Sequence, residues 1–129
     1  MNNPTLRRAA AIAWTLIMLW GCLLPGPKVP RIMAWHDKLM HVVIFVLFSV
    51  LWMLARPGGR TNWPDRAGAI RVLLAGLAFG IIIEVLQYTL PIRRSGDVED
   101  VIADFAGALL GVGVIWLGQT MLKRSDVSR

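Results

Sequence analysis

Four long apolar stretches dominate the chain, separated by short segments rich in proline, glycine and arginine. Such residues end apolar helices, so these segments set the limits of the stretches. We predict four helices at about residues 9–24, 39–55, 70–90 and 98–122. Each is close to the ~20 residues that a helix needs to cross the hydrocarbon core of a bilayer. The pattern predicts an all-α integral membrane bundle of four transmembrane helices, formed by a single domain over residues 1–129.

The composition agrees with a membrane protein. Hydrophobic residues make up 56% of the chain and charged residues 17%, which is too apolar for an ordinary soluble domain. The net charge is +6, but the basic residues lie in short segments between the apolar stretches. We therefore expect them to orient the chain and contact anionic lipids, and we predict no nucleic-acid partner. Cys22 is the only cysteine, which excludes an intramolecular disulfide and a cysteine-based metal cluster.

The distribution of lysine and arginine predicts the orientation. With a cytoplasmic N-terminus, nine basic residues fall on the cytoplasmic side and five on the opposite side. The positive-inside rule then places both termini in the cytoplasm. A competing reading is a cleaved signal peptide, because Leu19-Trp20-Gly21-Cys22 resembles a lipoprotein cleavage box. We favour a retained first helix, because the later helices need a partner to bury their polar residues.

Polar residues within the helices gather at the outer end of the bundle, opposite the termini. A charged residue near the centre of a bilayer costs on the order of 3 kcal/mol, so we expect Glu84 and Asp104 to face the bundle interior. A spacing of four residues places Asp37 and His41 on one face of their helix. The polar residues that share this outer end are Asp37, Lys38, His41, Glu84, Gln87, Arg93, Arg94, Asp97, Asp100 and Asp104.

The chemistry of these side chains suggests their roles. The candidate catalytic residues are His41, Glu84 and Asp104, because an imidazole and buried carboxyl groups can exchange protons near neutral pH. The candidate substrate-binding residues are Asp37, Lys38, Gln87, Arg93, Arg94 and Asp100. Among them, Lys38 with Arg93 or Arg94 would hold a phosphate. A divalent metal could bind to three of His41, Glu84, Asp100 and Asp104, but the chain has no metal-specific spacing such as His-Glu-x-x-His.

Structural roles stay open beside the functional ones. Asp37 and Asp97 could each cap the N-terminus of a helix. The basic residues Lys38, Arg93 and Arg94 could act only as anchors at the membrane interface. The small-residue pair in Gly107-x-x-x-Gly111 favours a close contact between helices over a ligand-binding loop.

The order and spacing of these residues resemble the VanZ-like family of small bacterial membrane proteins. The motifs that carry the resemblance are Asp37-Lys38-x-x-His41-x-x-x-Phe45, Glu84-x-x-Gln87 with Pro91, and Arg94-x5-Asp100-x3-Asp104-x2-Gly107-x3-Gly111. The family usually has asparagine where this chain has Asp104, which adds an ionisable group here. The namesake of the family is associated with resistance to the glycopeptide teicoplanin. The resemblance therefore implies a multi-pass protein of the bacterial cytoplasmic membrane that acts in the cell envelope.

Three functions remain open. In the first, the outer polar site binds or processes an envelope lipid or its head group, with anionic or envelope-precursor lipids as partners; whether the protein is an enzyme is undecided. In the second, the protein is a structural or assembly factor, and Lys38 and Arg94 pair with acidic residues only to hold the helices together. In the third, it carries protons or a small solute. The third is the least favoured, because the inner halves of the helices have no comparable charges.

Overall fold

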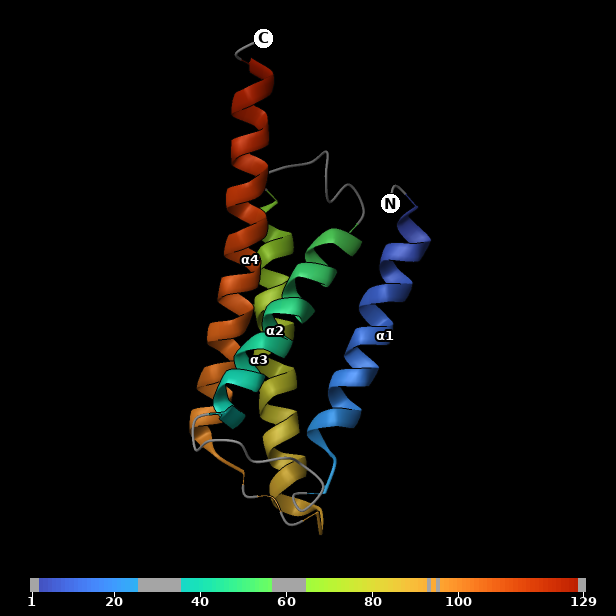
Figure 1. Ribbon diagram of the computed structural model, residues 1–129, viewed down its shortest axis with the longest axis vertical. Helices are drawn as coiled ribbons and strands as arrows, with labels where there is room; N and C mark the ends of the chain where they lie inside the picture. The colour runs from blue at the N-terminus through green and yellow to red at the C-terminus, as the bar shows by residue number, and fades with distance from the viewer. Residues whose placement is uncertain (1–2, 26–35, 57–64, 93, 95, 128–129) are drawn as a thin grey trace.

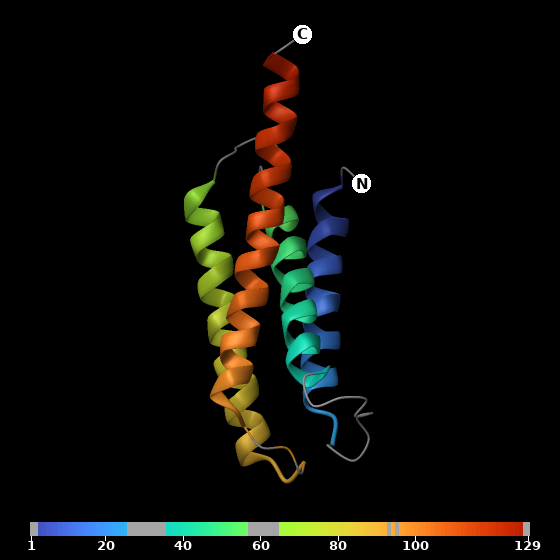
Figure 2. The ribbon, with the colours of Figure 1, turned by 60° about the vertical axis from the view of Figure 1, so that its left-hand side comes forward.

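All regular secondary structure in the described part of the chain is α-helix, as predicted. The structure is a computed structural model, and it describes residues 3–25, 36–56, 65–92, 94 and 96–127. The helices in these ranges are α1 (Pro4–Cys22), α2 (His36–Ala55), α3 (Arg66–Thr89) and α4 (Val98–Val127). They run up and down along a common axis, and both ends of the chain lie at the same end of the bundle (Figures 1 and 2). Which side of a membrane that end occupies stays a prediction.

Three of these helices are long and apolar enough to cross a membrane: Asp37–Ala55 in α2, Arg66–Thr89 in α3 and Val98–Met121 in α4. Their outward faces carry large exposed apolar side chains, such as Leu74 on α3 and Leu110 on α4. A surface of this kind suits contact with lipid. The fourth predicted crossing, by α1, stays a prediction.

Two of the helices begin several residues before the apolar stretches that predicted them. The side chain of Asn3 accepts a hydrogen bond from Thr5 N (2.9 Å) at the start of α1, where Pro4 occupies the first helical position. At the start of α3, Asp65 accepts from Gly68 N (2.8 Å). These caps are polar and therefore lie outside the apolar windows. Helix start signals locate these ends better than hydropathy does.

Helices α2 and α4 approach each other closely, because small residues line their contact. A Cβ atom at Gly107 would collide with the carbonyl oxygen of Val42, and one at Gly111 would lie 2.5 Å from the carbonyl oxygen of Val46. Only glycine allows backbones to come this close. The predicted close contact at Gly107 and Gly111 is confirmed, and it brings the outer halves of α2 and α4 together.

Helix α1 is attached to α2 by side-chain hydrogen bonds and by a small apolar core. Trp52 Nε1 donates to Thr15 Oγ1 (3.0 Å), and Trp14 Nε1 donates to the carbonyl of Ile44 (3.0 Å). The core residues are Met18, Cys22, Phe45, Phe48 and Ile83, contributed by α1, α2 and α3. Bonds of this kind hold helices together where lipid removes the hydrophobic drive between them.

Candidate functional site

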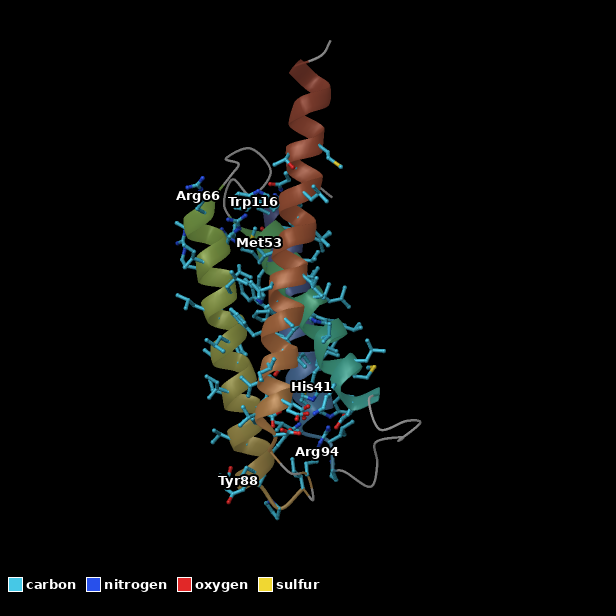
Figure 3. All side chains as sticks on the ribbon, turned by 90° about the vertical axis from the view of Figure 1, so that its left-hand side faces the viewer. His41, Met53, Arg66, Tyr88, Arg94 and Trp116 are labelled. Carbon is cyan, nitrogen blue, oxygen red and sulfur yellow. The ribbon has the colours of Figure 1, made fainter. Side chains whose placement is uncertain are left out.

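The centre of the candidate site is a set of three buried side chains from three helices, His41 on α2, Glu84 on α3 and Asp104 on α4, which we call the buried trio. Their exposed fractions are 2%, 7% and 0%, respectively. His41 Nδ1 lies 2.8 Å from Asp104 Oδ1, within hydrogen-bond distance. Figure 3 shows His41 near the same end of the bundle as Arg94, while Arg66 and Trp116 lie toward the other. The trio thus unites residues up to 63 positions apart.

Glu84 is also bonded to the backbone in front of α4. One of its oxygens, Oε2, accepts a hydrogen bond from the N–H of Asp97 (2.7 Å). The chain can pass this close because residue 96 is glycine, where a Cβ atom would lie 2.8 Å from the carbonyl oxygen of Glu84. A negative charge at this position also suits the N-terminus of α4. Glu84 thus binds the backbone at the start of α4, a contact that its place deep in α3 did not predict.

Two oxygens of the buried trio have no hydrogen-bond partner among the described residues. Within the described part of the chain, neither Glu84 Oε1 nor Asp104 Oδ2 makes a hydrogen bond, although both atoms are buried. One donor atom from each residue of the trio lies within 4.8 Å of the other two. Buried acceptors without partners cost stability, so each one calls for an explanation. Each of these two oxygens could accept a hydrogen bond or bind a cation.

Ion pairs surround the trio at the end of the bundle. The ammonium group of Lys38 on α2 lies near three carboxylates at the start of α4: Glu99 (2.8 Å), Asp97 (3.2 Å) and Asp100 (3.4 Å). The backbone N–H of Glu99 and the Lys38 ammonium lower the pKa of Asp97. The bond from Glu99 N to Asp97 Oδ1 (2.9 Å) also confirms Asp97 as a helix cap.

Arg94 ties the same end of the bundle to α1 and α2. Its guanidinium donates to Asp37 Oδ1 (3.1 Å) and to the carbonyl of Cys22 (3.3 Å), and its side chain is 11% exposed. Gln87 donates to the same Cys22 carbonyl (2.8 Å). The last carbonyls of a helix lack partners within it, so these two donors complete the C-terminus of α1. We call these contacts of Arg94 and Lys38 with carboxylates the rim ion pairs.

The structure brings most of the predicted site residues together, but in two groups. The trio is one group, and Lys38, Asp37, Arg94 and Asp100 belong to the rim ion pairs, with Gln87 beside them. Arg93 lies outside the described residues. Glu99 was missed, although its place in the first turn of the last helix, beside Asp100, was a signal for it. Among the described residues at this end, six carboxylates stand against two cations, Lys38 and Arg94.

A cavity of about 640 Å³ lies at the other end of the bundle, between α2 and α3. Its walls are largely apolar, and the ion pair between Arg56 Nη1 and Asp65 Oδ2 (2.6 Å) lies beside it. The apolar lining residues are Phe48, Trp52, Val72, Ala75 and Phe79. No member of the trio or of the rim ion pairs lines it.

Comparison with known proteins points to one family. A family model described as VanZ/LLP1 matches residues 6–119, a stretch that contains the whole polar end of the bundle. No curated protein and no solved structure matches the chain.

Proposed function

This chain belongs to the VanZ/LLP1 family of membrane-type helical proteins, and on this premise we propose that its buried trio binds the polar head group of an envelope lipid. In the proposal, the protein is a multi-pass protein of the bacterial cytoplasmic membrane, and the polar end faces outward. The observation that carries the proposal is that the trio takes no part in the rim ion pairs. Ionisable groups inside a membrane that do not serve packing are functional by default.

The rim ion pairs and the other bonds of Arg94 already join α1, α2 and the start of α4. Lys38 joins α2 to α4, and Arg94 joins the segment before α4 to α1 and α2. A purely structural trio would have its polar atoms satisfied, as buried polar groups in proteins normally are. Glu84 and Asp104 instead each keep one buried oxygen without a partner in the described part of the chain. This difference supports a ligand for the trio.

The depth of the trio suits a head group better than an acyl chain. His41 and Glu84 lie five residues, or about 7.5 Å, from the outer ends of α2 and α3, and Asp104 lies six residues, or about 9 Å, from the start of α4. The polar layer on each side of a bilayer is roughly 5–8 Å thick. A head group that dips slightly below this layer would reach the trio. At the rim it would pass Lys38, whose side chain is 39% exposed and whose ammonium is already paired with three carboxylates.

The test compares two acids at the same end of the bundle. Glu84→Gln removes a charge from the trio but keeps an oxygen that can accept from Asp97 N. Glu99→Gln makes the same chemical change at a residue that contacts Lys38 and is largely exposed. Lipids that stay bound to gently purified protein are measured by mass spectrometry. We expect Glu84→Gln to lose a bound lipid that the wild type and Glu99→Gln retain, and identical lipids in all three would refute the proposal.

A structural or assembly role is the second candidate, because Lys38 and Arg94 join α1, α2 and the start of α4. If the polar end only holds helices together, Lys38→Met and Arg94→Gln should reduce function in proportion to the loss of folded protein in the membrane. Function and folded amount are compared in the same membranes. Loss of function in Glu84→Gln at a wild-type folded amount would exclude this second candidate.

A further inference from the structure

We propose that His41, Glu84 and Asp104 bind a divalent metal ion of the Zn²⁺ or Mn²⁺ class. The site is that of the proposed function, and only the role of the ion rests on that function. One ring nitrogen and one oxygen of each carboxylate lie within 4.8 Å of one another. Ligands at about 2.0–2.2 Å from an ion in a tetrahedral site are about 3.3–3.6 Å apart, so the side chains need to close by at most about 1.5 Å.

The unpartnered oxygens are the independent observation that points to a cation. Glu84 and Asp104 are more than nine-tenths buried, and Glu84 Oε1 and Asp104 Oδ2 have no hydrogen-bond partner within the described residues. A hydrogen bond between them would need one of the acids to be protonated, whereas a cation can bind to both oxygens at once. The same two groups supply two of the three donor atoms in the cluster. The trio therefore offers two ligand oxygens, Glu84 Oε1 and Asp104 Oδ2, that nothing else in the described structure uses.

The charge around the trio also favours a cation. Lys38 is shared among three carboxylates, and Arg94 faces Asp37, so both cations of the rim are already engaged. This leaves Glu84 without a cationic partner among the described residues and Asp104 with His41 alone, in a setting where buried charges need a partner. His41 contributes positive charge only when it is protonated. A divalent ion would balance the two carboxylates while His41 stays neutral.

The backbone around Asp104 leaves room for its carboxylate at the face of α3. A Cβ atom at Gly80 would lie 2.9 Å from Asp104 Oδ2. Gly80 is four residues before Glu84, so both lie on the same face of α3. A larger residue at position 80 would push the Asp104 carboxylate away from Glu84. The small residue thus keeps the acids of two helices near each other.

The donor set selects the class of ion. An imidazole nitrogen suits Zn²⁺ and other transition metals, and carboxylates suit Mn²⁺ as well, whereas Mg²⁺ prefers oxygen ligands and retains its waters. Three protein ligands leave a coordination position for an oxygen from outside the protein, as in catalytic zinc sites. A phosphate or hydroxyl oxygen of the head group could take that position. The ion would then explain how an acid-rich site accepts an anionic head group.

The test uses the purified full chain in detergent, stripped of metal with a chelator. Zn²⁺, Mn²⁺ and Mg²⁺ are titrated in turn by isothermal calorimetry, and bound metal is counted by elemental analysis. We expect about one Zn²⁺ or Mn²⁺ per chain and much weaker Mg²⁺ binding. Glu84→Gln and Asp104→Asn should each lower the affinity at least roughly tenfold, because even supporting residues of metal sites change affinity by 10–100-fold. Glu99→Gln should change it less than twofold.

Binding that is absent, or that Glu99→Gln weakens as much as Glu84→Gln does, would overturn the proposal. If the variants of the trio fail to fold, the wild type decides by itself. Co²⁺ bound through one nitrogen and carboxylate oxygens should give a visible absorption spectrum that Zn²⁺ abolishes by displacement, and no such spectrum would count as failure. Lipid retention measured in parallel separates the two proposals. Ion binding without any change of lipids in Glu84→Gln refutes only the function, and lipid loss without ion binding refutes only the metal.

Discussion

The contact between α2 and α4 gives the sharpest test of how packing forms the site. The change is Gly111→Ala, and the matched control is Gly113→Ala on the same helix. A Cβ atom at Gly111 would lie 2.5 Å from the carbonyl oxygen of Val46 and 2.9 Å from Ser49 Cβ. A Cβ atom at Gly113 would meet nothing within 4 Å. The two substitutions thus add the same methyl group, one in a closed contact and one in open space.

The magnitude follows from these distances. Ordinary contact begins near 3.4 Å, so α2 and α4 would have to move apart by about 0.9 Å at Gly111. If the helices separate as rigid bodies, the 2.8 Å contact between His41 and Asp104 lengthens to about 3.7 Å, beyond hydrogen-bond distance. Overpacking of this kind costs about 1–3 kcal/mol. At Gly113, alanine should cost nothing and can add up to about 1 kcal/mol of stability through helix propensity.

The assay is unfolding of the purified protein in detergent, followed by circular dichroism. We expect Gly111→Ala to lower the free energy of unfolding by about 1–3 kcal/mol relative to Gly113→Ala. The lipids retained by Gly111→Ala should also decrease, because the site loses the contact between His41 and Asp104. Equal stability of the two variants would show that α2 and α4 do not approach each other as closely at Gly111 as described.

Three further predictions concern the ends of the helices. Lys38→Met should change the free energy of unfolding by less than about 1 kcal/mol, because exposed ion pairs contribute little. A larger loss in a denaturant titration would show that the ion pairs of Lys38 are stronger than their exposure suggests. Arg94→Gln should cost about 1–3 kcal/mol in the same assay, because the guanidinium is mostly buried and bonds to Cys22, and a neutral result would contradict that bond. Asp65→Ala should lower the free energy of unfolding by about 1–2 kcal/mol, because it removes both the cap of α3 and the partner of Arg56. Asp65→Asn should retain the cap, and an equal loss of stability in both variants would assign the effect to the ion pair alone.

The helices and the burial of the acids could be predicted from the sequence, because both follow from local composition. Apolar stretches between breakers predict helices, and a carboxylate within such a stretch has to face other helices and not lipid. Gly107 and Gly111 likewise indicate a close contact wherever their helix meets another. These inferences need no knowledge of which helices are neighbours.

The partners of the polar residues could not be predicted in the same way. Lys38 could pair with any of several acids, and its choice depends on how α4 begins beside α2. The bond from Asp97 N to Glu84 depends on the path of the segment after α3. In that segment, Gly96 allows the backbone to pass close to the carbonyl of Glu84. The division of these residues into the buried trio and the rim ion pairs becomes visible only when the four helices and the segment before α4 are placed together.

The most direct test of the account measures lipid retention and stability in the same set of variants. Glu84→Gln and Asp104→Asn change the buried trio, whereas Lys38→Met and Arg94→Gln change the rim ion pairs. Retained lipid is measured by mass spectrometry and the midpoint of thermal unfolding by circular dichroism. We predict that the trio variants lose the bound lipid at a nearly wild-type midpoint, while the rim variants retain lipid in proportion to the folded protein that remains. Lipid loss that follows the midpoint across all four variants would contradict the account.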